Sequence, residues 1–369
     1  MAAPARFAIV GNGWRAQFFH RVAAALPDAL SVSGVVVRSE QTAERVRKHW
    51  ACPTYSSVAE LVAADRPDFL ISSVPTEITA SVVEACVALG VPVLAETPPA
   101  ADVAALRALW NRVGSSGLVQ VAEQYRLMPM HAARQSLVRS GVIGAPSSIQ
   151  LSSTHGYHAV SLIRGLLDTG FEPARVSAQI FMAPLADPMG QRGWNADDRP
   201  KPATTTIATI DFGDAMALYD FTDNQWHNQL RSRRMVIRGS LGEISNTDVV
   251  RLAAPQTFLE SSIVRRQIGY DLDLDGYDTD HISFEGRILW RNPFAGSRFS
   301  DEEIAIATLL LGVADWSRGN APGPYPLADA CQDQLIALAI ESSLESGATI
   351  TTAVEAWAGQ ASTDPRRET

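Results

Sequence analysis

The sequence predicts two folded domains, an α/β domain with a doubly wound parallel sheet and an α+β domain with an open, mostly antiparallel sheet. Strand-like and helix-like segments alternate in the first third of the chain, which is typical of parallel strands joined by crossover helices. The strands there are apolar throughout, whereas those beyond residue 126 alternate polar and apolar residues. A chain of 369 residues suits two domains, which we place at residues 1–126 and 127–369.

Local patterning predicts each element of the first domain. Apolar runs indicate strands at 6–10, 32–37, 69–74, 91–95 and 118–122. The segments between them are helix-like, at 14–25, 40–49, 57–64, 76–89 and 102–114. Their strict alternation indicates a parallel sheet with helices on both faces.

The pattern changes over residues 124–129, where the second domain begins. A helix is expected at 131–139, and helices at 301–318 and 326–346 close the chain. Alternating residues predict strands at 147–152, 175–182, 204–212 and 215–221. A stretch rich in Pro, Gly and Asp, 183–203, predicts a long loop of the kind that often carries function. We expect residues 362–369 to be disordered.

Composition excludes several classes of protein. The net charge of −9 argues against nucleic-acid binding, and no apolar run is long enough to span a membrane. The N-terminus passes directly into the first strand, so we expect no secretory signal. Cys52, Cys86 and Cys331 predict buried, reduced thiols in a cytoplasmic protein, and no cysteine or histidine spacing suggests a metal site.

A glycine-rich turn joins the first strand to the first helix. The run Gly11-Asn12-Gly13-Trp14-Arg15-Ala16 follows an apolar strand and matches the dinucleotide-binding pattern G-x-G-x-x-G/A. Gly11 would permit the tight turn, Gly13 would let N–H groups approach a pyrophosphate, and Ala16 would let helix and strand pack closely. The helix N-terminus would offer its N–H groups to the phosphates. The alternative is a tight turn without a ligand.

The residues after the second strand bear on the choice between NAD and NADP. Arg38-Ser39 stands where an acidic residue would contact the ribose 2′-hydroxyl of NAD. An arginine there often accommodates the 2′-phosphate of NADP, and Glu40 follows directly. We expect NAD and keep NADP as an open alternative.

Further motifs follow in order along the chain. They are Ser73-Val74-Pro75 with the later run 90–98, Glu123-Gln124-Tyr125-Arg126, a helix beginning His155-Gly156-Tyr157-His158, and the ending 325–347. With the glycine turn, they make nearly the whole chain resemble the Gfo/Idh/MocA family, whose members are NAD(P)-dependent enzymes that act mostly on sugars and polyols.

The resemblance implies an N-terminal Rossmann domain and a C-terminal α+β domain whose outer sheet face forms subunit contacts. We therefore expect a homodimer or homotetramer. Beside the glycine turn, it implies that the cofactor is held by Ser73, Val74, Pro75, Glu96, Thr97 and Gln124. Glu96 would position cofactor or substrate, with a structural role as the alternative.

Two departures from the family pattern bear on the chemistry. The family's Glu-Lys-Pro motif supplies a lysine beside the nicotinamide that acidifies the substrate hydroxyl, and here Thr97 stands at that position. The family's substrate helix usually has an aspartate four residues before its histidine. Here the histidine is His158, and Thr154 stands at the position of the aspartate, where the resemblance implies a substrate contact. Of the three expected polar groups, His158 alone remains.

His158 is the expected catalytic base, because an imidazole can accept a proton near neutral pH. His155 lies three residues earlier, so both histidines could share one helix face with Tyr157 beside them. Either histidine could instead be a packed core residue. Tyr125 is a further catalytic candidate and Arg126 a candidate substrate contact, since both stand where the chain leaves the first domain; an ordinary hinge contact is the alternative.

The segment 226–234 carries several arginines in an acidic protein. Guanidinium groups bind carboxylate, sulfonate or phosphate through paired N–H donors, so Arg231 and Arg233 could read an anionic substituent on a sugar. The alternatives are a solvated strand face or salt bridges between subunits. Trp194, Arg192 and Lys201 are similar candidates in the loop 183–203.

Three functions fit these residues. The first is a redox-neutral glycosidase, because some relatives of the family hydrolyse glycosides with NAD bound and regenerated, and also lack the lysine. Oxidation of a ring hydroxyl acidifies the neighbouring C–H, a base removes that proton, the anomeric group is eliminated, water adds and the ketone is reduced. The arginines favour a sulfonated or carboxylated pyranoside as substrate.

The second function is a plain sugar or polyol dehydrogenase with His158 as base. The third is a catalytically silent protein that only binds the cofactor. Under each of them the partner of the chain is a small molecule, a carbohydrate in the first two.

Overall fold

The computed structural model describes residues 3–190, 193–269, 273 and 275–359. In this part of the chain, two compact units form, one from residues 1–128, 297–334 and 355–369, the other from 129–296 and 335–354. The chain first passes from one unit to the other after Met128, two residues beyond the boundary expected from sequence. The later chain returns to the first unit because α8 (Asp301–Ser317) packs on α1 (Ala16–Ala25). A division into two continuous segments does not anticipate that return.

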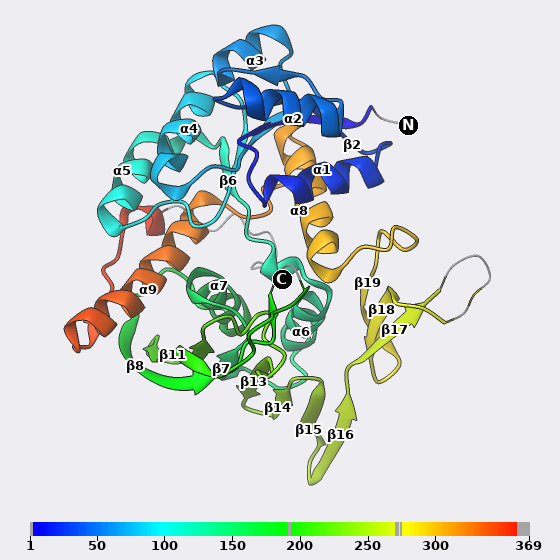
Figure 1. Cartoon of the computed structure of the whole chain (residues 1–369). Coiled ribbons are helices and arrows are strands. Elements are labelled where there is room, and N and C mark those ends of the chain that lie inside the picture. The colour runs from blue at the N-terminus through cyan, green and yellow to red at the C-terminus, as the bar shows by residue number, and fades with distance from the viewer. Residues whose placement is uncertain (1–2, 191–192, 270–272, 274, 360–369) are drawn as a thin grey trace. The chain divides into compact units, whose positions relative to one another are not determined.

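In the first unit, the described strands form a parallel sheet in the order β3-β2-β1-β4-β5-β6 (Figure 1). The strands are β1 (Ala5–Val10), β2 (Leu30–Val36), β3 (Thr54–Tyr55), β4 (Phe69–Ser72), β5 (Val93–Ala95) and β6 (Val119–Val121). β1 pairs with β2 on one side and β4 on the other, so the strand order reverses there. Ligands of doubly wound sheets bind outside the carboxyl ends of the strands at this reversal.

The remaining helices of this sheet are α2 (Glu40–Trp50), α3 (Val58–Ala64), α4 (Thr76–Ala88) and α5 (Val103–Val113), with short 3₁₀ turns η1 (Gly114–Ser116), η2 (Tyr125–Leu127) and η3 (Ala356–Gly359). Side chains fix where α2, α3 and α5 begin, because Ser39, Ser57 and Asp102 each accept a backbone N–H of the first turn. The predicted alternation of strands and helices is confirmed. The two-residue β3 was not expected, being too short to leave a pattern.

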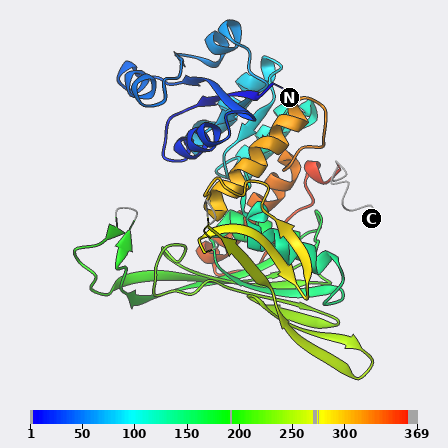
Figure 2. The same ribbon diagram turned by 90° about the vertical axis from the view of Figure 1, so that its right-hand side faces the viewer.

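In the second unit, the described strands form a sheet in the order β16-β15-β14-β13-β7-β12-β11-β8-β20. Their bounds are β7 (Pro146–Ser152), β8 (Arg175–Leu185), β11 (Lys201–Asp211), β12 (Met216–Thr222), β13 (Arg234–Gly239), β14 (Gly242–Ser245), β15 (Asp248–Ala254), β16 (Thr257–Ser262) and β20 (Ile350–Thr351). Neighbours are antiparallel except β7 and β12. The β15–β16 hairpin extends from one end of the sheet (Figure 2).

Helices α6 (Pro129–Arg139) and α7 (Gly156–Leu167) belong to this unit, and α9 (Leu327–Ser346) begins in the first unit and ends in the second. A separate sheet contains β17 (Val264–Ile268), β18 (Asp278–Phe284) and β19 (Arg287–Arg291). The large sheet has one buried face, since Ile149, Tyr219 and Ile237 are almost fully enclosed while Leu218 is exposed. The antiparallel, half-buried sheet expected from sequence is confirmed.

The stretch 183–203 is more ordered than the expected loop. It contains the ends of β8 and β11 and a small hairpin of β9 (Met189–Gly190) and β10 (Gly193–Trp194). The expectation was wrong there because Pro184 and Pro202, read as loop residues, lie opposite each other in the β8–β11 ladder. Arg192 and residues 362–369 lie outside the described residues.

The structure also bears on two expectations from composition. The three cysteines are buried and unbonded to one another, and burial raises the pKa of Cys52 to about 11 and that of Cys86 to about 12. No helix in the described part of the chain is long and apolar enough to cross a membrane.

His20 gives a testable consequence of burial in the first unit. Its ring is 3% exposed and stacks on Trp50 at 4.6 Å. Burial, helped by the charge of His49, lowers the pKa of His20 from 6.5 to about 4. The unfolded chain therefore binds the extra proton first, and the stability that neutral His20 contributes above pH 6.5 is lost as the pH falls towards 4.

We expect the variant His20→Phe, which keeps a ring on Trp50 but cannot titrate, to flatten this dependence. In urea unfolding between pH 6.5 and 4.5, the slope of the unfolding free energy should fall by up to about 1.4 kcal/mol per pH unit. The exposed His49 provides the control, because His49→Phe should keep most of the wild-type slope. Equal slopes in wild type and His20→Phe would contradict the assignment.

Candidate functional site

The glycine turn lies at the carboxyl end of β1, where the order of the parallel sheet reverses. Gly11 has a φ of 104°, and its N–H donates to the carbonyl of Val36 at 2.9 Å. A Cβ at Gly11 would lie 2.1 Å from the carbonyl oxygen of Ser73. Only glycine fits this close approach, which brings two of the predicted cofactor segments together.

Gly13 differs from Gly11, because a Cβ there would meet no protein atom within 4 Å. Its φ is not in the left-handed region. No side chain caps the first turn of α1, where the N–H groups of Gln17 and Phe18 donate to the carbonyls of Trp14 and Arg15, and Ala16 is fully buried. This cradle fits the pyrophosphate of a dinucleotide, which would take the hydrogen bonds that no side chain takes.

The rest of the turn is held by its neighbours. Asn12 accepts from the amide of Gln17 at 3.0 Å, and Gln17 in turn accepts from the indole N–H of Trp50 at 3.2 Å. Trp14 is 59% exposed and meets Phe18 edge-on. Beyond the turn, Pro75 precedes the first residue of α4, and the Ser73 N–H donates to the carbonyl of Val10, while Val74 lies between them.

The segment at 38–40 keeps both cofactors open. Ser39 caps α2, and Glu40 forms an ion pair with Arg47 in the same helix. Arg38 is exposed at the end of the second strand, where a ribose 2′-phosphate would lie.

Arg15 is the centre of a charged group in the first unit. Its guanidinium lies 3.7 Å from Glu96 and 2.6 Å from Glu302 on α8. Burial disfavours its charge, but these two carboxylates overcome that and raise the pKa of Arg15. With its amide oriented to satisfy both neighbours, Gln124 donates to the Ala122 carbonyl at 2.8 Å and accepts from Arg15 at 3.1 Å. Arg15, which belongs to the glycine turn expected to hold the pyrophosphate, is therefore also the cation that contacts Glu96.

Thr97 stands beside this group, and its backbone N–H donates to Glu96 at 3.4 Å. Its neutral hydroxyl cannot supply the charge of the lysine that the family resemblance places here. Glu96 itself is held by Arg15, which explains how a partly buried carboxylate is kept at this position.

The segment Glu123–Arg126 is built into the first unit by internal contacts. The Tyr125 N–H donates to Glu123 at 2.8 Å. Burial disfavours the Arg126 charge, yet Tyr325, Asp333 and Asp329 raise the pKa of Arg126, and its guanidinium lies 5.8 Å from the Tyr325 ring centre. These contacts favour the hinge alternative for Arg126 over the substrate contact.

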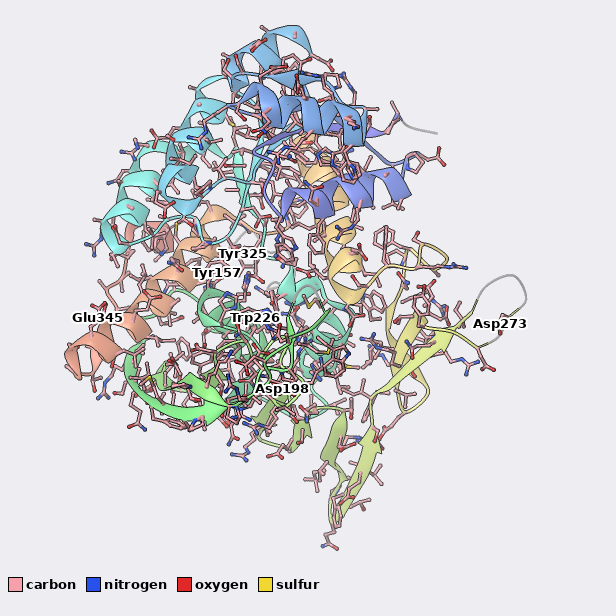
Figure 3. The ribbon with its side chains drawn as sticks, in the orientation of Figure 1. Tyr157, Asp198, Trp226, Asp273, Tyr325 and Glu345 are labelled. Carbon is pink, nitrogen blue, oxygen red and sulfur yellow. The ribbon has the colours of Figure 1, made fainter. Side chains whose placement is uncertain are left out.

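In the second unit, an aromatic group surrounds the start of α7 (Figure 3 labels Tyr157 and Trp226). The His158 ring centre lies 5.4 Å from that of His155 and 5.4 Å from that of Tyr157. His155 also lies 5.4 Å from Trp226, whose ring stacks on Phe221 at 5.7 Å. The structure therefore brings together the three candidate acid/base residues of this helix and adds an aromatic wall beside them.

The two histidines differ in surroundings. His158 is 7% exposed, whereas His155 is solvent-accessible at the position before α7. Desolvation by the protein atoms around it, with the charge of His158, lowers the pKa of His155 to about 4, so it is neutral at pH 7. Thr154 is fully buried and its hydroxyl has no hydrogen-bond partner among the described residues.

The predicted arginines are only partly joined to this group. Arg233 donates to the main-chain carbonyl of Trp226. Arg231 donates to the carbonyl of Leu230 next to it, Lys201 pairs with Asp197, and Trp194 is 79% exposed on the β9–β10 hairpin. The described contacts do not bring Arg231, Lys201 or Trp194 to the histidines.

Residues 5–124 match the profile of a family described as oxidoreductase family, NAD-binding Rossmann fold, Gfo/Idh/MocA. This match spans about a third of the chain. It confirms the expected resemblance, the Rossmann fold and the NAD-binding character of these residues. No group of histidine, cysteine or acidic side chains in the described residues is placed to hold a metal ion.

Solved structures share the fold over nearly the full chain. An oxidoreductase from Agrobacterium radiobacter, in complex with NAD⁺, L-tartaric acid and magnesium, is 15% identical with a TM-score of 0.69, covering 94% of this chain and 98% of that one. Levoglucosan dehydrogenase with NADH and levoglucosan is 16% identical, TM-score 0.67, covering 95% and 99%. The WlbA dehydrogenase from Chromobacterium violaceum, with NADH and UDP-GlcNAcA, is 14% identical, TM-score 0.64, covering 96% and 97%. A search of curated protein sequences gave no significant match.

Sequence reasoning missed several residues of these two groups. Glu302 contacts Arg15 across 287 positions of the chain, so no local spacing links this pair. Phe221 is only five residues before Trp226, but it lies within a strand and was read as a strand residue alone. The signal available was indirect: Ser300 and Glu303 form a capping box that fixes the start of α8 and hence the place of Glu302.

The contrast between Gly11 and Gly13 predicts two different losses. Gly13→Ala should fold normally, because a Cβ there meets nothing, but it should weaken NAD⁺ binding at least about tenfold by filling the space of the pyrophosphate. Gly11→Ala should lower the midpoint of thermal unfolding, because its Cβ would strike the Ser73 carbonyl. NAD⁺ titration followed by tryptophan fluorescence, with thermal unfolding of each variant, measures both. Wild-type affinity in Gly13→Ala would show that the dinucleotide does not occupy this turn.

Proposed function

We propose that this protein is an NAD-dependent enzyme acting on a sugar ring, and that it cleaves a glycoside of an anionic sugar in a redox-neutral cycle. The observation that carries the proposal is the group of His155, Tyr157 and His158, whose rings lie 5.4 Å apart in successive pairs. A simple dehydrogenation needs one proton acceptor, whereas oxidation followed by elimination needs proton transfer at a hydroxyl, at a neighbouring carbon and at the leaving oxygen.

When bound, NAD supplies the electron acceptor that turns one ring hydroxyl into a ketone, and at the end of the cycle the same hydride regenerates the hydroxyl. His158 takes the hydroxyl proton. His155, neutral at pH 7 because its pKa is lowered to about 4, can take the proton from the acidified C–H. Tyr157 then protonates the departing glycosidic oxygen. Water gives its hydroxyl to the anomeric carbon and its proton to Tyr157, and His155 returns its proton to the neighbouring carbon. Every proton removed is returned before the sugar leaves.

Arg15 addresses the loss of the expected lysine. Two carboxylates hold it charged beside Thr97, so a cation remains at the carboxyl end of the first sheet although the lysine is absent. We assign to Arg15 the positioning of Glu96 at the carboxyl end of the first sheet.

The relatives support action on carbohydrates, since levoglucosan dehydrogenase was solved with levoglucosan and WlbA with UDP-GlcNAcA. The same names favour the second candidate, a sugar or polyol dehydrogenase with His158 as its base. The third candidate, a silent cofactor-binding protein, is disfavoured by the preserved group of acid/base residues at α7.

One assay separates the three functions. Purified protein is incubated with nitrophenyl glycosides of neutral, carboxylated and sulfonated sugars, with and without added NAD⁺, while nitrophenol and NADH are followed by absorbance. We expect nitrophenol release from an anionic glycoside without net NADH. Stoichiometric NADH from the free sugar would establish the dehydrogenase instead. If neither nitrophenol nor NADH is produced, the protein only binds the cofactor.

His158→Ala should reduce whichever activity is found by about 10³-fold, as for removal of a general base. His155→Phe, which keeps an aromatic ring beside Trp226, should lower aglycone release and leave oxidation of the free sugar, because only elimination needs it. His49→Ala, an exposed histidine on α2, is the control that should retain wild-type activity. Unchanged aglycone release in His155→Phe would refute its role in elimination.

We also propose a cytoplasmic homodimer or homotetramer that associates through the outer face of the large sheet. Phe181, Leu218, Val250 and Phe258 are exposed on the strands of this sheet. Exposed apolar side chains on a sheet face are found at protein interfaces.

The substitution Leu218→Glu tests this association. A charge at the centre of the sheet should shift the sedimentation velocity profile towards the monomer while leaving the thermal midpoint of the monomer unaltered, because Leu218 is 37% exposed. A wild-type protein that sediments as a monomer would rule the interface out.

A further inference from the structure

A cavity of about 520 Å³ lies in the second unit, at the end of the β8–β11 ladder. Its lining comes from the end of β8, from the residues between β10 and the start of β11, and from the turn that follows β12. None of the described lining residues belongs to the group of His155, Tyr157 and His158. The volume falls within the range of about 300–1,000 Å³ that is usual for small-molecule sites.

The lining of this cavity is polar. Eight of the twelve described lining residues have polar or charged side chains, whereas most small-molecule sites are lined mainly by apolar groups. Leu185 and Asn228 are buried. Arg199, Lys201 and Asp223 are exposed, so the cavity has an enclosed side and opens to solvent. A ligand that enters it must replace its hydrogen bonds to water by hydrogen bonds to these side chains.

Side-chain amides hold the walls of the cavity in place. The amide of Asn224 donates to Asp187 at 3.0 Å, and the amide of Asn228 donates to the carbonyl of Ala186 at 2.9 Å. The side-chain oxygen of Asn228 accepts the N–H of Leu230 at 2.8 Å. These bonds join the turn after β12 to the end of β8, so the cavity is formed without a ligand.

Two carboxylates of the lining keep acceptor capacity. The Oδ1 atom of Asp187 is buried and has no hydrogen-bond partner among the described residues, while its Oδ2 accepts from Asn224 and lies 3.7 Å from Nε2 of His227. Asp223 uses its Oδ2 to accept the N–H of Thr204 at 3.0 Å. A buried carboxylate oxygen without a donor costs free energy, which a hydroxyl donor of a ligand would recover.

The charges of the lining indicate which ligand fits. Asp197 lies 2.9 Å from Arg199 and 3.3 Å from Lys201. With Asp187 and Asp223, the described lining contains three carboxylates and two cations, an excess of one negative charge that does not favour an anion. It offers hydrogen-bond acceptors and donors together. A hydroxyl both donates and accepts, so a neutral ligand with several hydroxyls matches this lining.

We propose that this cavity binds a neutral sugar ring. The turn that lines it also borders the histidine group, since Gln225 donates to the carbonyl and the hydroxyl of Ser152 at 3.1 and 2.8 Å, and the Trp226 ring lies 5.4 Å from His155 (Figure 3 labels Trp226). That the bound ring belongs to the substrate of the histidine group rests on the proposed function. That the cavity recognises a neutral sugar does not.

Binding measurements on the NAD-loaded protein test this cavity without turnover. The probes are the methyl glycosides of glucose, galactose and mannose, with the uronic acid of whichever sugar binds most tightly. By calorimetry, we expect at least one neutral glycoside to bind with a Kd of about 1 mM or tighter, and its uronic acid to bind more weakly.

Two variants of the lining should weaken this binding at least about tenfold. Asp187→Ala removes the acceptor oxygens of the wall. Ala196 is exposed and lines the cavity, so Ala196→Trp should fill part of it without disturbing a core. Thermal unfolding of each variant checks that it is folded. Ala104→Trp, at an exposed alanine on α5 of the first unit, is the matched control that should keep the wild-type affinity.

His158→Ala locates the bound sugar, because His158 does not line the cavity and its loss should leave the affinity unchanged. The proposal is overturned if no neutral glycoside binds, if the uronic acid binds more tightly, or if binding persists in Ala196→Trp and disappears in His158→Ala. A protein that binds the sugar in this way but releases no aglycone from any glycoside would keep the cavity and refute the proposed glycosidase. Aglycone release without binding in the cavity would do the reverse.

Discussion

The approach of Gly11 to the carbonyl of Ser73 is the contact on which the cofactor half of the molecule depends. A Cβ at Gly11 would lie 2.1 Å from that oxygen, so the ends of β1 and β4 can come this close only with glycine between them. The contact fixes where α1 begins. The start of α1 in turn places Gly13 against open space and Arg15 between Glu96 and Glu302.

Each unit contains a buried arginine, but the two arginines have different partners. In the first, Arg15 is enclosed by two carboxylates, which keep it charged and leave little attraction for a further anion. In the second, Arg134 is buried against a carbonyl and an imidazole, and burial together with the charge of Arg265 lowers its pKa. The first arrangement orients a carboxylate near the cofactor turn, whereas the second holds a buried guanidinium without a carboxylate contact among the described residues.

Prediction succeeded where local spacing reports directly on structure. The apolar runs of the first sheet, the glycine turn and the helix that carries His158 follow from residues that are neighbours in sequence. It failed at β9 and β10, whose two-residue strands are held by pairing rather than by propensity, and at the division of the chain, because α8 returns to pack on α1. The contact of Arg126 with Tyr325 could not be predicted from spacing either, because the two residues lie far apart along the chain.

The sequence by itself determined the NAD-binding domain, the order of its elements and the replacement of the expected lysine and aspartate by Thr97 and Thr154. These follow from residue identity and short-range pattern. Only the tertiary structure decided which polar groups meet: that Arg15 contacts Glu302, and that Arg134 donates to the carbonyl of Asn246. Electrostatic energy depends on distance in space and on burial, and neither quantity is written in the spacing of residues along the chain.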